Sequence, residues 1–288
     1  MKIIITGKNG YISTNLSEFL NSKGFTANTI SVREQNLNLD FTGTDVLVHC
    51  AGIVHKKEKD FKELYEKVNV ELTIELAKKS RKQGVSHFIF FSSMSVYGSD
   101  ISKISENTPL LPKTLYGKSK LQAEKELLKL ADDNFFVTIV RPPMVYGKNC
   151  PGNYNRLCKI IKASPIFPLI HNKKSMIYIK NLCFFIFQII TERKKGTFMP
   201  MDKDYISTSY MAEIISKANN KKIIFSKLFG KFIYCFKNFG IVKKAFGSLY
   251  YDEGYATKVD FISTEDAIIE TEKMIWYKKT PNSNIILR

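Results

Sequence analysis

Cysteine and histidine are scarce in this chain of 288 residues, and neither forms the close pairs that zinc sites and disulfide frameworks need. The five cysteines are an odd number, lie scattered along the sequence and include no Cys-x-x-Cys pair, and the four histidines show no spacing typical of metal ligands. We therefore expect free thiols in a reducing compartment and no metal site.

Long apolar runs are also missing. The longest apolar run without a charge, Leu182–Ile190, is far shorter than the roughly 20 residues that a membrane-spanning helix requires. The first residues, MKIIITG, contain too short an apolar run for a signal peptide, so we expect a cytoplasmic protein. With 44% hydrophobic and 25% charged residues, the chain can bury one large core or two closely joined ones.

Acidic residues are outnumbered, with 27 Asp and Glu against 44 Lys and Arg, which gives a formal net charge of +17. Arginine, however, occurs only at positions 33, 81, 141, 156, 193 and 288. Proteins that bind nucleic acids usually depend on arginine for bidentate contacts, so the composition argues against a nucleic-acid partner. The lysines indicate a solvated basic surface that favours a polyanionic small molecule or an anionic membrane.

Strand-like and helix-like patterns alternate through the first half of the chain. Short apolar runs predict strands at Lys2–Thr6, Phe25–Val32, Asp45–Cys50, Phe88–Ser92 and Val137–Arg141. Amphipathic stretches between them predict helices at Tyr11–Ser22, Phe61–Gln83 and Leu115–Ala131. Such alternation predicts an α/β fold with a doubly wound parallel sheet.

The pattern changes after Gly147. A short helix at Tyr154–Lys162, a strand at Met176–Ile179 and a helix at Leu182–Glu192 are followed by a less regular tail. We expect residues 1–147 to form the doubly wound domain, with 173–193 packing back onto it. Residues 148–288 are expected to form a smaller mixed lobe that shares a cleft with it.

A glycine-bearing turn, Thr6-Gly7-Lys8-Asn9-Gly10, joins the first strand to the first helix. The free N–H groups and the dipole of a helix N-terminus favour an anion there, and a dinucleotide pyrophosphate occupies this place in doubly wound folds. Gly7 permits the tight turn and Gly10 lets the backbone approach the phosphates. Ser13 stands at the third small position, where Gly is usual.

The end of the second strand decides between NAD and NADP in such folds. An acidic residue there binds the ribose hydroxyls, whereas an arginine receives the 2′-phosphate. This strand ends Ile30-Ser31-Val32-Arg33. Because Ser31 stands where a carboxylate would be expected and Arg33 follows it, NADP(H) is favoured and NAD(H) remains possible.

Tyr116 and Lys120 are four residues apart at the start of a predicted helix and therefore share one face. A phenol is a poor acid or base near neutral pH unless a cation lowers its pKa, and Lys120 is expected to be that cation. Ser93, at the end of the strand Phe88–Ser92, supplies a hydroxyl that can bond both Tyr116 and a substrate oxygen.

Together these motifs resemble the extended short-chain dehydrogenases/reductases, in the branch of nucleotide-sugar epimerases, dehydratases and reductases. The resemblance rests on segments that occur in family order over about half the chain: TGKNGYIS (6–13), LVHCAG (47–52), NV (69–70), FFSSMSVYG (90–98), YGKSK (116–120) and RPPMVYG (141–147). It implies a Rossmann-type sheet, with the C-terminal lobe binding substrate.

The resemblance also implies a role for each matching residue. Ser93, Tyr116 and Lys120 would be catalytic, with Tyr116 and Lys120 also contacting the cofactor. The remaining cofactor-binding residues would be Gly7, Asn9, Gly10, Tyr11, Ile12, Arg33, Asp40, Cys50, Ala51, Gly52, Asn69, Pro142 and Pro143. Substrate would meet Ser93, Met94, Ser95, Met144, Asn153 and Arg156.

Departures from the family pattern narrow the reaction. The resembling dehydratases carry an Asp-Glu-type pair after the catalytic Ser or Thr, where this chain has Met94 and Ser95, so dehydration is not expected. Met144 replaces a common substrate-binding Asn, and Asn153 or Arg156 would take over that contact. The open alternatives are a 4-ketoreductase acting on a UDP-(N-acetylamino)-6-deoxy-hexose in polysaccharide biosynthesis, which we favour, and an NAD-dependent UDP-sugar 4-epimerase. A non-catalytic dinucleotide sensor is a more distant alternative.

Two further expectations concern partners. The family resemblance implies a homodimer formed through the helices Phe61–Gln83 and Leu115–Ala131. The segment 225–246 alternates aromatic residues with lysine. This pattern is consistent with peripheral contact to an anionic membrane or with packing in the core of the smaller lobe.

Overall fold

A computed structural model describes residues 1–32, 39–54, 61–236 and 239–276. Within these residues, six strands form one parallel sheet in the order β10-β6-β4-β3-β1-β2. The strands are β1 (Lys2–Thr6), β2 (Thr26–Ile30), β3 (Val46–His49), β4 (His87–Phe91), β6 (Phe136–Val140) and β10 (Gly196–Phe198). The predicted doubly wound α/β fold is confirmed.

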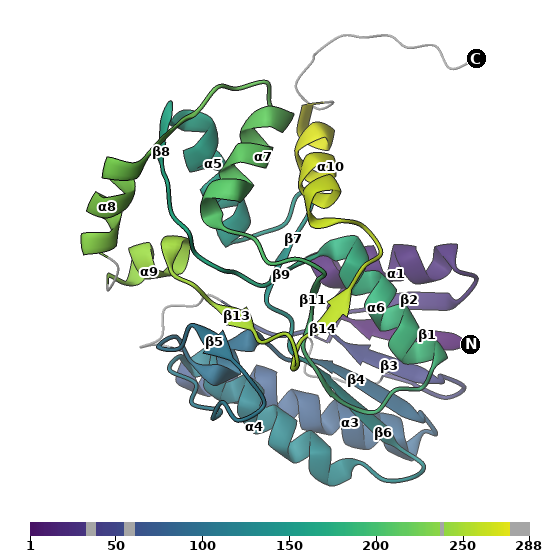
Figure 1. Cartoon of the computed structure of the whole chain (residues 1–288). Coiled ribbons are helices and arrows are strands. Elements are labelled where there is room, and N and C mark those ends of the chain that lie inside the picture. Colours follow the sequence, from purple (N-terminus) through teal and green to yellow (C-terminus); the bar gives the residue numbers. More distant parts are fainter. Residues whose placement is uncertain (33–38, 55–60, 237–238, 277–288) are drawn as a thin grey trace, which may run out of the picture.

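Helices cover both faces of this sheet (Figure 1). Helices α1 (Tyr11–Ser22) and α6 (Ile179–Thr191) pack on one face, and α3 (Leu72–Lys82) and α4 (Leu115–Leu130) on the other. The alternation along β1 shows why: Ile3 and Ile5 are buried against the first pair of helices, and Ile4 against the second. A strand buried on both faces is apolar along its centre, as Ile3–Ile5 are in β1, and the buried Thr6 at its end has its hydroxyl bonded to His49.

The sequence-based strand boundaries agree with the structure to within two residues, but the helix expected at Phe61–Gln83 is not continuous. It consists of α2 (Lys62–Tyr65), a π-helical turn (Glu66–Glu71) and α3. A single π-helical turn is too short to change the hydrophobic periodicity of the whole segment, so the sequence pattern does not reveal the break.

The smaller lobe contains more helix than the expected irregular tail. It is built from β7 (Met144–Tyr146), α5 (Asn153–Ala163), β8 (Ile166–Pro168), β9 (Met176–Tyr178), β11 (Pro200–Asp202), α7 (Thr208–Ala218), β12 (Ile224–Ser226), α8 (Lys227–Cys235), α9 (Gly240–Phe246), β13 (Tyr250–Tyr251), β14 (Thr257–Val259) and α10 (Thr264–Trp276). Its strands form short parallel pairs, β7–β9, β8–β12 and β11–β14.

Residues beyond the proposed boundary at 147 return to the main sheet. Helix α6 packs on α1, in the region expected to pack back, and β10 then pairs with β6 through residues after 193. The returning segment is therefore longer than predicted. The division into 1–147 and 148–288 stays a prediction.

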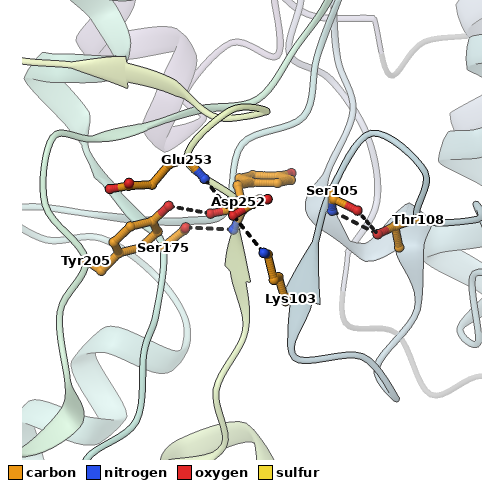
Figure 2. Close-up of polar contacts among 8 residues, drawn as sticks. Lys103, Ser105, Thr108, Ser175, Tyr205, Asp252 and Glu253 are labelled. Carbon is orange, nitrogen blue, oxygen red and sulfur yellow. Dashed lines mark hydrogen bonds and ion pairs between the residues drawn. The ribbon is translucent and has the colours of Figure 1, made fainter.

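The lobe also contacts the loop that follows β4. Strand β13 pairs with β5 (Lys103–Ile104), and Lys103 forms an ion pair with Asp252 at 3.0 Å. Figure 2 shows Tyr205 and Ser175 beside Lys103 and Asp252. At this junction the Tyr205 hydroxyl donates to the Tyr251 carbonyl, and the Ser175 hydroxyl accepts from the Tyr251 amide. These bonds fix Tyr251, whose side chain reaches towards the sheet.

Candidate active site

The turn between β1 and α1 has the backbone geometry that its glycines predict. Gly7 has a φ of +96° and Asn9 of +66°, both in the left-handed region. A Cβ on Gly10 would lie 2.8 Å from the Gly7 carbonyl oxygen, so no larger residue fits there. Gly10 is also the N-cap of α1, and no side chain caps this end of the helix. The amides of the first helical turn are therefore oriented as an anion site requires.

Ser13 replaces the usual third glycine with a specific contact. Its side chain is buried, and its hydroxyl bonds the carbonyl oxygens of Gly7 and Gly10. The serine therefore holds the turn closed as well as being small enough for helix–strand packing.

A chain of buried hydrogen bonds centred on His49 holds Thr6, the residue just before this turn. His49, at the end of β3, bonds the hydroxyls of Thr6 at 2.8 Å and Thr73 at 2.9 Å. The Thr73 hydroxyl proton goes to the Asn69 carbonyl, so Nε2 of His49 is the donor to Thr73 and Nδ1 accepts from Thr6. Burial lowers the pKa of His49 to about 3, with Lys120 acting in the same direction, and the ring is neutral.

Asn69 continues this chain from the π-helical turn. Its side-chain oxygen accepts from the Ile53 amide at 2.9 Å, and its nitrogen donates to the Ile53 carbonyl and to the Ser119 hydroxyl. Ser119 in turn donates to the Tyr116 carbonyl. Asn69 therefore joins the loop after β3 to the first turn of α4.

A cavity of about 190 Å³ opens at the carboxyl ends of the sheet strands. It is lined by Ile12, Cys50, Gly52, Val54, Phe91, Ser92, Ser93, Tyr116, Lys120, Pro142, Pro143 and Val145. Of the three expected catalytic residues, Ser93 follows β4, and Tyr116 and Lys120 lie on α4. In the cavity they meet two segments expected to bind the cofactor, the loop after β3 and the two prolines after β6. Ligands of doubly wound folds bind at this edge of the sheet.

The Ser93 hydroxyl lies close enough to that of Tyr116 to lower the Tyr116 pKa. Thr114 caps α4 by accepting from the Gly117 amide, which sets Tyr116 in the first helical turn. Gly117 is needed for this approach, since a Cβ there would lie 2.7 Å from the Ser95 carbonyl oxygen. The local packing thus brings the two hydroxyls together.

Lys120 is almost fully buried, at 3% exposure. Its ammonium lies 4.5 Å from the centre of the Phe90 ring and 3.2 Å from where a Gly52 Cβ would stand. Burial lowers the pKa of Lys120 to about 8. A buried lysine with a pKa near neutrality is typical of a functional site.

The expected lowering of the Tyr116 pKa is wrong for the chain by itself. Burial raises the pKa of Tyr116 to about 12, and the hydrogen bond with Ser93 offsets only part of this effect. Desolvation disfavours the phenolate more strongly than the surrounding groups favour it.

A buried ion pair lies behind the site. Arg141, at the end of β6 and just before the two prolines, donates to both carboxylate oxygens of Glu124 at 3.0 and 2.6 Å and to the Tyr97 hydroxyl. The Tyr251 hydroxyl from the smaller lobe donates to the Arg141 carbonyl at 2.8 Å. The prolines that border the cavity are thus anchored both to α4 and to the lobe.

Apart from Ser93, the residues predicted to bind substrate do not line this cavity. Met94 is buried in a separate apolar cluster, and Met144 packs against the main core. Ser95 contributes its backbone to the packing against Gly117, and Asn153 and Arg156 are exposed on α5. Their roles in substrate binding stay predictions.

The structure describes only some of the residues expected to bind the adenosine part of the cofactor. Asp40 is exposed, and its carboxylate accepts from the Thr42 amide. Arg33, on which the preference for NADP(H) rests, lies outside the described residues. Gly7 and Ala51 are close, with the Ala51 amide 3.3 Å from where a Gly7 Cβ would stand.

The sequence analysis missed several cavity residues, of which Ser92 is the most informative. Its hydroxyl is buried in the cavity wall and finds no hydrogen-bond partner among the described residues. Ser92 directly precedes Ser93, so a second hydroxyl at the end of the strand was the available indication.

Comparison with known proteins decides the family. A model of the NAD dependent epimerase/dehydratase family matches residues 3–194. The chain belongs to this family. It is an NAD(P)-dependent sugar-nucleotide enzyme of the extended short-chain dehydrogenase/reductase type.

Two curated members illustrate the similarity. The chain is 32% identical over 272 residues to the UDP-glucose 4-epimerase of Vibrio cholerae, covering 80% of this chain and 82% of that protein. It is also 32% identical over 198 residues to the N-acetyl-alpha-D-glucosaminyl-diphospho-ditrans,octacis-undecaprenol 4-epimerase of Escherichia coli O157:H7, covering 66% and 59%.

The crystal structure of the UDP-glucuronic acid 4-epimerase of Bacillus cereus in complex with NAD shares the fold. It aligns with a TM-score of 0.72 at 20% identity and covers 96% of this chain and 99% of that one. At this identity the likeness extends to the fold alone.

Proposed function

We propose that this enzyme is a nucleotide-sugar 4-epimerase and that Ser93, Tyr116 and Lys120 carry out its chemistry. The meeting of these three side chains in one cavity, with Ser93 beside Tyr116, is the observation that carries the catalytic assignment. The choice of epimerisation is supported by the 32% identity to a UDP-glucose 4-epimerase over most of both chains.

The residues fit a dinucleotide. Gly7 and Gly10 leave the backbone bare where a Cβ would obstruct a close approach, and the uncapped start of α1 faces the same turn. Gly52, Lys120, Pro142 and Pro143 line the cavity where a nicotinamide and its ribose would lie. When bound, the nicotinamide supplies reversible hydride exchange with a sugar carbon.

The side chains of this enzyme supply the proton transfer. Tyr116 accepts the proton of the sugar hydroxyl as the carbonyl forms and returns it when the carbonyl is reduced. Ser93 holds the Tyr116 hydroxyl and the substrate oxygen in line. Burial makes the Tyr116 phenolate costly, so this chemistry requires a cation nearby, and Lys120, in the same cavity, is the residue we assign to that role.

A 4-ketoreductase is the second candidate. It is favoured by Ser31 and Arg33, which follow β2 in the sequence at the positions where an acidic ribose ligand would be usual for NAD. Dehydration is excluded, because the two residues after Ser93 are Met94 and Ser95, and neither has a carboxylate that could act as acid or base.

One experiment separates the candidates. Purified enzyme is incubated with UDP-glucose and, in parallel, with UDP-N-acetylglucosamine, and sugar stereochemistry and cofactor absorbance are followed together. An epimerase interconverts the 4-epimers with no net change in NADH or NADPH. Steady consumption of NADPH with a 4-keto nucleotide sugar, and no interconversion, would replace the proposal by the reductase.

Tyr116→Phe tests the catalytic assignment. Loss of the hydroxyl should reduce kcat by about 10²- to 10⁴-fold while dinucleotide binding persists. Tyr210→Phe is the matched control, because Tyr210 is an exposed tyrosine on α7. Equal activities of the two variants would dismiss the assignment and favour a dinucleotide sensor.

We also propose a homodimer formed through the exposed surfaces of α3 and α4. Sedimentation velocity should then give about twice the mass of the 33.1 kDa chain. A single species of monomer mass at micromolar concentration would rule the dimer out.

A further inference from the structure

Helix α8 and the segment leading into α9 expose large apolar side chains. Leu228 is 79% exposed, Tyr234 and Phe239 are each 65% exposed, and Phe232 is 59% exposed. In Figure 1 the two helices lie at the outer edge of the smaller lobe, away from α1 and α6. Such a cluster is unusual, because monomeric proteins rarely expose large contiguous apolar patches.

The backbone explains why these side chains are not buried. Gly230 is the buried residue of α8, and a Cβ there would lie 2.2 Å from the Leu169 carbonyl oxygen. The helix thus rests on the chain after β8 through a glycine, which brings its axis close and turns its side chains outward. The Phe236 ring lies 5.1 Å from that of Phe232 and 5.8 Å from that of Phe239.

The two explanations of segment 225–246 therefore apply to different residues. Phe225 and Phe246 pack against the main core, as core packing predicts. Leu228, Phe232 and Phe239 do not, so core packing is wrong for them. Within the part of the chain that the structure describes, these apolar side chains are left exposed to solvent.

The charge around this patch is of one sign. From Ile214 to Tyr251 the sequence contains no Asp or Glu. Lys222, Lys227, Lys231 and Lys244 are exposed and form no ion pair within the described part of the chain, whereas Lys243 is paired with Asp100. Apolar side chains flanked by unpaired lysines match an anionic bilayer, whose headgroups attract the lysines and whose acyl boundary accepts the aromatic rings.

We propose that this surface docks the enzyme on an anionic phospholipid membrane. We name it the α8 face: Ile224, Leu228, Phe232, Tyr234 and Phe239, with Lys222, Lys227, Lys231 and Lys244. The apolar side chains enter the headgroup region and the lysines contact lipid phosphates. None of the helices within the described residues is long and apolar enough to cross a bilayer, so the contact is peripheral.

A second copy of this chain is a poorer occupant of the α8 face. A two-fold dimer pairs each patch with itself, which would set its lysines against the same lysines of the other copy with no acidic residue between them. The like charges would oppose the association that the apolar side chains favour.

Co-sedimentation with vesicles tests the proposal. Wild-type enzyme should sediment with vesicles of 70% phosphatidylcholine and 30% phosphatidylglycerol in 0.1 M NaCl, and remain in the supernatant with pure phosphatidylcholine. Each lysine near such a surface contributes about 1 kcal/mol, so Lys227→Glu/Lys231→Glu should weaken binding at least about tenfold. Leu228→Ser/Phe232→Ser should weaken binding while the charge is unchanged.

The matched control is Lys23→Glu/Lys195→Glu. These two lysines are exposed, lie outside α3, α4 and the α8 face, and give the variant the same net charge as Lys227→Glu/Lys231→Glu. It should bind vesicles like the wild type. Circular dichroism confirms that each variant is folded.

Three results would overturn the proposal. The first is no sedimentation of the wild type with anionic vesicles, and the second is equal losses in both charge variants. The third is self-association of the wild type, seen by sedimentation velocity without lipid, that Leu228→Ser/Phe232→Ser abolishes. None of these outcomes bears on the proposed reaction, which is measured separately with water-soluble nucleotide sugars.

Discussion

Lys120 is almost completely buried, and burial of its ammonium group reduces the stability of the folded chain. Its pKa in the folded chain is about 8, against an ordinary value of 10.5. The folded state therefore disfavours the ammonium form, by about 3 kcal/mol on the usual conversion. The charge lies in the cavity that Ser93 and Tyr116 also line, so this cost falls at the proposed site.

We expect Lys120→Met to stabilise the dinucleotide-free protein at pH 7 while abolishing activity. Because the folded pKa is depressed, Lys120 destabilises most below pH 8, and the effect disappears as the pH rises towards 10.5. The gain in unfolding free energy should therefore shrink between pH 8 and 10. Urea unfolding at several pH values measures this.

Lys118→Met is the control for that experiment. Lys118 is exposed on the same helix, two residues before Lys120. Its replacement should change the unfolding free energy by less than about 0.5 kcal/mol at each pH. A pH-independent difference for Lys120→Met would contradict the assigned burial of the charge.

At the scale of elements, the turn between β1 and α1 depends on a residue without a side chain. Gly10→Ala would place a Cβ 2.8 Å from the Gly7 carbonyl oxygen, so the turn must shift. We expect dinucleotide affinity to fall by about tenfold or more, since the helix amides would no longer face the phosphates in register. Fluorescence titration with NADH and NADPH measures the change.

Gly254→Ala serves as the comparison for Gly10→Ala. A Cβ at Gly254 meets nothing within 4 Å, and the residue has no positive φ. Affinity should be unchanged in this variant. If both glycine variants bind alike, the turn is not the pyrophosphate site.

The π-helical turn is the second element that the site depends on. Asn69→Ala would remove the bonds to Ile53 and to Ser119, which tie the loop after β3 to α4. We expect a loss of about 1–3 kcal/mol in stability and weaker dinucleotide binding. Differential scanning fluorimetry with and without NADH reports both effects.

Asn134→Ala is the corresponding control, because Asn134 is exposed in the loop after α4. It should leave the melting temperature and the ligand-induced shift as they are. A similar loss in both variants would argue that Asn69 has no special place in the site.

At the scale of the whole molecule, Arg141 connects three parts of the fold. It pairs with Glu124 of α4, bonds Tyr97 of the loop after β4, and accepts through its carbonyl from Tyr251 of the smaller lobe. The pair is buried, with side-chain exposures of 9% and 2%. Breaking it would leave an unpaired charge inside the protein.

We therefore expect Glu124→Gln to lower the unfolding free energy by about 3 kcal/mol. Activity should fall as well, because Pro142 and Pro143 follow Arg141 at the cavity. Glu126→Gln, two residues away on α4, breaks an exposed pair with Lys129 and should cost about 0.5 kcal/mol at most. Equal costs would show that the buried pair does not join the parts.

The sequence by itself determined the parallel sheet and pointed to the residues that we propose as catalytic. Both follow from short-range sequence patterns. Apolar runs predict buried strands, glycines mark the turn, and the four-residue spacing puts Tyr116 and Lys120 on one helix face. Ser93 could be placed because parallel strands end at one edge of a sheet.

Tertiary packing decided what local patterns do not encode. The π-helical turn at Asn69, the return of β10 to the sheet and the contact of Tyr251 with Arg141 join segments far apart in the chain. The pKa values of Lys120 and Tyr116 depend on how many neighbours exclude water from them, which no spacing reveals. The exposure of Leu228 and Phe232 was likewise decided by packing, because Gly230 sets how α8 rests on the lobe.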